Sequence, residues 1–187
     1  MLKYIRSYLK IEWLHDGKDI KKKIDTFYPL AISGLVFCIY LIVFFKFNID
    51  IELIFRSESF ASLMNLFFAL PGFYIAALAA CLTINNPYFI YVNAKNNLKG
   101  VIAGDRVHIP IRTLFTTAFS YLTYLSFLLL LLYYVSDYFY ENQFFKVTNN
   151  IYYILKNIFN SLIIFIFLRI IFVTLACVAY LGDRAQR

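Results

Sequence analysis

Four long apolar stretches, separated by shorter polar segments, dominate the pattern of this 187-residue chain. They cover about residues 27–45, 60–84, 111–134 and 158–181. A helix needs about 20 mostly apolar residues to cross a hydrocarbon core of roughly 30 Å, because each residue rises about 1.5 Å. Each stretch meets that length. The pattern therefore predicts an all-α integral membrane protein, a single four-helix bundle over residues 1–187.

The residues before the first stretch, 1–26, predict a short amphipathic helix. Apolar side chains recur there at spacings of three and four, which places them on one helix face: Leu2, Ile5, Leu9 and Trp13. Lys3, Arg6 and Lys10 lie elsewhere around the same helix. A basic helix with tryptophan at its edge suits the headgroup layer of a membrane. Packing on a partner protein is the alternative.

The second stretch carries a proline and a set of small residues near its middle. Pro71 removes a backbone donor and predicts a kink. Gly72, Ala76 and Ala80 let helices approach closely, so this span is expected to pack centrally, within one protomer or between several. A pore lining hinged at Pro71 is the alternative. Asn65 is either an interhelical hydrogen-bonding residue or a boundary residue.

Arg169 lies close to the middle of the fourth stretch. A central arginine costs about 2.5–3.5 kcal/mol on insertion scales, so such residues face a bundle interior or a wet cavity. No acidic residue is expected at the same depth in the other spans. The expected partners are backbone carbonyls, bound anions, water, or hydroxyls such as Ser120 and Thr123. We hypothesise that Arg169 faces a cavity between helices or subunits; snorkelling to the membrane surface is the alternative.

The middle loop, residues 85–110, contains two apolar segments, 88–92 and 101–103, on either side of a polar stretch. This pattern fits a small hairpin or an amphipathic lip on the membrane, followed by a turn at Gly104 and Asp105. His108 has no second histidine or cysteine beside it in the sequence, which favours a structural role over catalysis.

Composition and charge agree with a membrane location. The chain is 61% hydrophobic and 16% charged, with a formal net charge of +7. Soluble domains have about 45–50% apolar and 25% charged residues. Thirteen Lys and Arg residues lie on one side of the spans, seven in the N-terminal segment, four in the middle loop and two in the tail, against four on the other. This bias predicts a multi-pass membrane protein with both termini and the middle loop cytoplasmic.

The basic residues on the predicted cytoplasmic side are expected to face anionic lipid or a partner protein, and direct nucleic-acid binding is not expected. They are Lys3, Arg6, Lys10, Lys21, Lys22, Lys23, Lys95, Lys99 and Arg106.

Residues for catalysis or metal binding are scarce in this sequence. Cys38, Cys81 and Cys177 are far apart and all lie in apolar stretches, so they are interpreted as packing residues. The sequence has no paired carboxylates in a span, no HExxH motif and no phosphate-binding glycine loop. We therefore predict no catalytic residues, no cofactor and no metal site.

The segment NLFFALPGFYIAAL at residues 65–78, together with the basic N-terminus and the four stretches, resembles the KwaA family. These proteins are the membrane subunits of the bacterial Kiwa anti-phage defence system. The resemblance covers the whole chain in layout and only this short segment in sequence. It implies a homo-oligomer, a tetramer, in the bacterial inner membrane that senses phage-induced membrane perturbation and works with a cytoplasmic DNA-binding protein, KwaB. It assigns no individual functional residues.

Two functions follow from these observations. The first is a sensor or scaffold subunit of an anti-phage defence complex that recruits or regulates a cytoplasmic partner. The second is a small pore former, such as a defence effector, a holin-like protein or a channel. In that case Arg169 and Pro71 would line or gate the path, and the arginine would favour anions.

Overall fold

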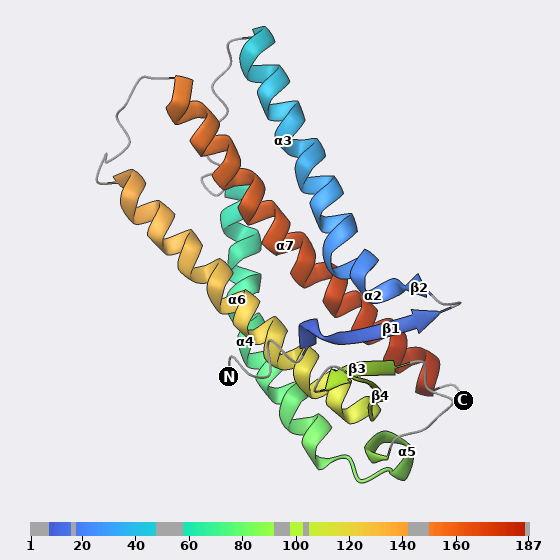
Figure 1. The fold of residues 1–187 in the computed structure, drawn as a ribbon. Coiled ribbons are helices and arrows are strands. Elements are labelled where there is room, and N and C mark those ends of the chain that lie inside the picture. The colour runs from blue at the N-terminus through green and yellow to red at the C-terminus, as the bar shows by residue number, and fades with distance from the viewer. Residues whose placement is uncertain are drawn as a thin grey trace.

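The structure, a computed structural model, describes residues 8–15, 18–47, 58–91, 98–102, 105–141 and 150–185. Four long helices make up most of it (Figure 1): α3 (Tyr28–Phe47), α4 (Glu58–Thr83), α6 (Ile111–Glu141) and α7 (Asn150–Ala185). Each belongs to a segment long and apolar enough to cross a membrane. The prediction of an all-α, four-helix membrane bundle is confirmed.

Helix α6 provides the centre of the bundle. Phe115, Ala118 and Leu122 are completely buried, and they lie at spacings of three and four on one face of the helix. Side chains of α4 and α7 close over them. Tyr74 of α4 and Thr174 of α7 are joined by a hydrogen bond of 2.7 Å between their hydroxyl oxygens. Packing and such hydrogen bonds hold helices together in lipid, where the hydrophobic effect between helices is absent.

Helix α3 is attached differently, because α7 is the only long helix with which it makes extensive contact among the described residues. The Ser161 hydroxyl donates to the Ser33 carbonyl at 3.0 Å. Tyr28, the first residue of α3, lies against Phe172 with ring centroids 6.2 Å apart. Most of the helix surface is exposed apolar side chain, with Leu35 60% exposed. Its 20 residues span about 30 Å, the thickness of a hydrocarbon core.

A small antiparallel sheet lies at one end of the bundle, near the C-terminal end of α7 (Figure 1). Its strands run in the order β2-β1-β3-β4. Their bounds are β1 (Ile11–His15), β2 (Lys18–Asp19), β3 (Leu98–Ile102) and β4 (Asp105–His108). Ile11 pairs with Gly100, so the N-terminal segment is bound directly to the connection between the second and third spans. Both therefore lie at the same end of the bundle.

The predicted N-terminal amphipathic helix is wrong from Ile11 onward, because β1 occupies that part of the chain. Of the described residues before β1, only Tyr8 and Leu9 are helical, and Lys3, Arg6 and the other residues of 1–7 lie outside the described part. The physical reason is tertiary: β3 supplies backbone hydrogen bonds to β1. Local helical periodicity cannot reveal such a partner, which lies more than 80 residues away in the sequence.

The middle connection contains the expected hairpin, but with different strands. The hairpin pairs β3 with β4, from Lys99 opposite His108 to Ile102 opposite Asp105. The first apolar segment, expected at 88–92, does not form a strand in its described part: residues Pro87–Ile90 form the short helix α5. Pro87 is the first residue of that helix, a position where its missing N–H costs nothing.

The sheet allows a direct test, because Gly100 lies where a side chain would clash. A Cβ built on Gly100 would lie 2.9 Å from Cγ2 of Ile109, and Ile109 is itself buried. We expect Gly100→Ala to lower the thermal midpoint of the detergent-solubilised protein, by the equivalent of about 1–3 kcal/mol.

Gly34→Ala is the matched control, since a Cβ on Gly34 of α3 meets no atom within 4 Å. Replacing a glycine inside a helix should leave stability unchanged or raise it by about 0.5–1 kcal/mol. Equal effects of the two substitutions would contradict the close packing of β3 on Ile109.

Candidate functional site

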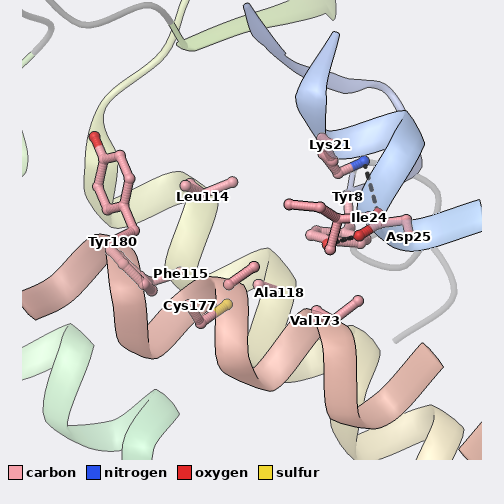
Figure 2. Close-up of a pocket in the computed structure, with 11 residues that line it drawn as sticks. Tyr8, Lys21, Ile24, Asp25, Leu114, Phe115, Ala118, Val173, Cys177 and Tyr180 are labelled. Atoms are coloured by element: carbon pink, nitrogen blue, oxygen red, sulfur yellow. Dashed lines mark hydrogen bonds and ion pairs between the residues drawn. The ribbon is translucent and has the colours of Figure 1, made fainter. Parts of the chain in front are cut away.

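A cluster of charged and aromatic side chains is buried where the N-terminal segment meets the bundle. Asp25, Lys21 and Tyr8 are only 4%, 8% and 3% exposed. Oδ2 of Asp25 lies 3.4 Å from Nζ of Lys21, and its Oδ1 accepts a hydrogen bond of 3.1 Å from the Tyr8 hydroxyl. Figure 2 shows these three side chains together at one side of a small pocket. The carboxylate is therefore bound by a cation and by a hydroxyl.

Local helical geometry brings the two charges together. Lys21 is in the short helix α2 (Ile20–Lys22), and Asp25 is in the π-helical turn η1 (Lys23–Phe27) that leads into α3. Residues four apart lie on the same side of a helix, so an ion pair at this spacing is favourable. The turn η1 also packs against α7, which buries the pair.

Tyr8 connects the N-terminal segment to this cluster through packing and hydrogen-bond contacts. Its ring stacks on that of Tyr121 of α6, with centroids 4.7 Å apart and planes 20° apart. Nζ of Lys21 lies 4.1 Å from the centroid of the Tyr8 ring, within cation–π distance. Burial, and then the negative charge of Asp25, raise the pKa of the Tyr8 hydroxyl well above its usual value. The hydroxyl therefore remains protonated at neutral pH and donates to the carboxylate.

Arg169 of α7 lies next to the same cluster. Its guanidinium carbon is 5.2 Å from the ring centroid of Tyr121 and 5.8 Å from that of Phe165. Its Nε is buried and has no hydrogen-bond partner among the described residues. Arg169 and Asp25 line one cleft, and the arginine acts electrostatically on that carboxylate. Arg169 thus combines aromatic packing with an unused donor.

Two expectations about Arg169 need correction. An acidic residue does lie beside it, namely Asp25, which precedes the first predicted stretch but is carried against α7 by η1. Ser120 and Thr123 are not its partners: their hydroxyls donate to carbonyls of their own helix, those of Thr116 and Phe119. Threonine and serine inside a helix commonly form such bonds.

The packing of α7 on α3 also changes the position of Arg169 relative to the other spans. It is three residues, less than one turn, from Phe172, which contacts the first residue of α3. Helix α7 has 36 residues and extends past α3 toward the sheet. The middle of the fourth apolar stretch is therefore level with the start of the first span.

Two cavities adjoin the Lys21–Asp25 pair. The pocket drawn in Figure 2 has a volume of about 20 Å³ and is otherwise lined by apolar residues of α6 and α7, among them Phe115 and Cys177. That volume is enough for about one water molecule. A larger cleft of about 360 Å³ lies between the N-terminal segment and α7. Its charged lining residues are Lys10, Lys21, Lys22, Arg169, Glu12 and Asp25.

The small residues of the second span do not pack inside the protomer. Gly72, Ala76 and Ala80 are exposed on α4, and a Cβ on Gly72 would meet nothing within 4 Å. Pro71 is buried, and α4 continues through it; the predicted kink stays a prediction. Asn65 is exposed on α4 and belongs to neither cavity. These three small residues therefore lie on a face of α4 that is not packed within the protomer, and their packing between protomers stays a prediction.

The predicted basic residues divide into distinct environments. Lys10, Lys22 and Lys23 are exposed, as expected for a membrane-facing or partner-facing surface, and Lys99 is half-buried in β3. Lys21 differs from that expectation because it is buried against Asp25 and Tyr8. Arg106 belongs to β4, and Lys95 lies outside the described residues.

Among the described residues no three His, Cys, Asp or Glu side chains gather in a group that could hold a metal ion. The absence of metal, cofactor and catalytic residues stays a prediction. Comparison with protein-family models, with curated proteins and with solved structures finds no match for this chain.

Sequence reasoning did not identify Asp25 and Tyr8 as parts of a site. A signal was available for Asp25, because it lies four residues after Lys21 at the start of a span. No sequence signal indicated Tyr8, whose role depends on stacking against Tyr121, 113 positions away.

The buried pair predicts a specific mutational pattern. Asp25→Asn removes the carboxylate that lies 3.4 Å from the buried Lys21 ammonium, and we expect a loss of about 3 kcal/mol in thermal or denaturant unfolding in detergent. The double variant Lys21→Met/Asp25→Asn should recover much of that loss, because a buried ion pair replaced by neutral groups costs little.

Lys22→Met is the control, since Lys22 is the exposed neighbour of Lys21 and its loss should change stability by less than about 0.5 kcal/mol. The single variant Lys21→Met completes the double-mutant cycle. If the effects of Lys21→Met and Asp25→Asn on the free energy of unfolding add up to that of the double variant, the two side chains are not coupled and the buried ion pair is refuted.

Proposed function

We propose that this chain is a membrane-embedded sensor or scaffold subunit that couples the state of its transmembrane helices to a cytoplasmic partner. One observation carries the proposal. The sheet outside the long helices is built from two distant segments, and the cluster around Asp25 and Tyr8 fixes it to the bundle. A sheet tied to the helices in this way must follow their movements.

The contacts describe how such coupling would work. Tyr8 stacks on Tyr121 of α6 and bonds to Asp25 at the start of the first span, while Arg169 of α7 lies over the same Tyr121 ring. Three spans and the N-terminal segment therefore meet at one point. Helix α3 exposes apolar side chains along its length and rests mainly on α7, so it is the span most open to forces from lipid.

The orientation is part of the proposal. The sheet end carries most of the Lys and Arg residues, and the positive-inside rule assigns it to the cytoplasm of a bacterium. The long helices would then cross the inner membrane, with both termini inside the cell. The basic surface would face anionic lipid and a protein partner, and this chain would bind no nucleic acid directly.

The resemblance to the KwaA family supplies the biological setting: an anti-phage defence complex with a cytoplasmic, DNA-binding partner similar to KwaB. The sheet is the element that such a partner can reach. β4 is an outer strand, and Val107 within it is 44% exposed. Outer strands carry unpaired backbone groups that another chain can bind.

The exposed small residues of α4 support homo-oligomerisation. Gly72, Ala76 and Ala80 recur every four residues on one helix face, which is a spacing that lets two transmembrane helices approach closely. The tetramer rests on the resemblance alone.

Co-purification tests the scaffold function. The detergent-solubilised chain should retain the soluble protein encoded by the adjacent gene, and Val107→Asp should reduce that retention at least about tenfold, because a buried unpaired charge disrupts an interface. Tyr138→Asp is the control, since Tyr138 is 61% exposed at the opposite end of α6.

Dye release tests the competing function on the same preparation. Liposomes that contain only this chain should keep a small encapsulated dye. Release without any partner, together with no retention of the neighbouring protein, would overturn the scaffold and favour a small pore.

Oligomerisation has its own test. Gly72→Leu should shift the protein toward monomer in size-exclusion chromatography with light scattering, because the larger side chain separates the α4 faces. Gly34→Leu makes the same change on exposed surface of α3 and should leave the oligomer intact. An oligomer that survives both substitutions would exclude this face as the contact.

A further inference from the structure

We propose that the cleft between the N-terminal segment and α7 is a binding site for a phosphate group, carried either by an anionic lipid headgroup or by a soluble ion. The inference goes beyond the proposed function and does not depend on it. Four observations support it: the positive charge of the lining residues, the Nε–H group of Arg169 that has no acceptor among the described residues, the volume of the cleft, and its position along the transmembrane helices.

The lining of the cleft is positively charged. Four cations, Lys10, Lys21, Lys22 and Arg169, face two carboxylates, those of Glu12 and Asp25. Lys21 is already engaged with Asp25 at 3.4 Å. An excess of two positive charges remains over the whole lining, and a phosphodiester or phosphate would neutralise one or both of them.

Arg169 offers the directional contact. Its guanidinium lies within cation–π distance of the rings of both Tyr121 and Phe165, which limits the orientations available to it. Its Nε is buried and has no hydrogen-bond partner within the described ranges. A buried donor without an acceptor is costly, and an arginine fork matches the paired oxygens of a phosphate. The oxygen atoms of a bound phosphate would remove that cost.

The size and level of the cleft fit a headgroup. Its volume is about 360 Å³, far more than a single water molecule needs. Asp25 and Thr26, at the beginning of the first candidate span (Lys23–Lys46), form part of its wall, so one side of the cleft lies at the end of a span, where lipid headgroups meet the helices. Basic pockets of this kind between transmembrane helices bind anionic headgroups.

Lys10 and Lys22 provide variants that should fold, because both side chains are exposed. The purified full-length chain is reconstituted into nanodiscs of phosphatidylcholine alone, phosphatidylcholine with phosphatidylglycerol, or phosphatidylcholine with added inorganic phosphate. Thermal midpoints are measured in each, and phosphatidylglycerol binding is titrated in detergent. The fluorescence of Trp13, the sole tryptophan, which follows Glu12 in β1, provides a second readout.

We expect phosphatidylglycerol to raise the midpoint and to bind the wild-type protein more tightly than phosphatidylcholine. Lys10→Gln/Lys22→Gln should weaken that binding by about 25-fold, about fivefold for each lysine. Arg169→Gln should weaken phosphatidylglycerol binding at least about tenfold. Arg169→Lys keeps the positive charge but loses the planar pair of N–H donors, so its affinity should lie between those of the wild type and Arg169→Gln. Lys46→Gln removes one charge at the opposite end of α3 and should change binding little.

The arms of the experiment identify the source of the phosphate. A shift with phosphatidylglycerol but not with inorganic phosphate assigns the site to lipid, and a shift with inorganic phosphate in phosphatidylcholine assigns it to a soluble ion. No shift in either arm would overturn the proposal. Equal losses of phosphatidylglycerol affinity per charge removed in Lys46→Gln and in Lys10→Gln/Lys22→Gln would also overturn it. Binding would then depend on the net charge of the protein and not on the cleft.

Discussion

The burial of charge at the start of the first span is the constraint on which the rest of this structure depends. A carboxylate or an ammonium group removed from water loses several kcal/mol of solvation unless an opposite charge and hydrogen bonds replace it. The partners of Asp25 are Lys21, one helical turn before it, and the Tyr8 hydroxyl. Because these partners come from different parts of the N-terminal segment, compensation of the charge also fixes the path of the chain.

The position of the small sheet follows from that path. Tyr8 cannot leave the cluster without exposing the Tyr121 ring and removing a donor from Asp25, so the chain that follows it is held close to the bundle. β1 then lies where β3 can pair with it. The connection between the second and third spans is thereby joined to the N-terminal segment in one sheet.

The bundle itself is unequal in its packing. α4, α6 and α7 share a core around Phe115 and Leu122, whereas α3 is a mostly exposed helix attached through α7. Arg169 lies at the point where these parts meet, next to Asp25 and in a cleft with excess positive charge. The structure therefore combines a core shared by three helices, one mostly exposed span, and a charged junction between them.

The sequence alone determined the membrane location and the four spans, because about 20 apolar residues in a row have no other stable solvent than lipid. It also indicated the small residues of α4 and the hairpin in the middle connection, since both depend on short-range patterns. Only the tertiary structure decided that residues 11–15 form a strand, that Gly72 faces outward and that Asp25 and Arg169 line the same cleft. Each of these depends on contacts between segments far apart in the chain, whose energies no local periodicity contains.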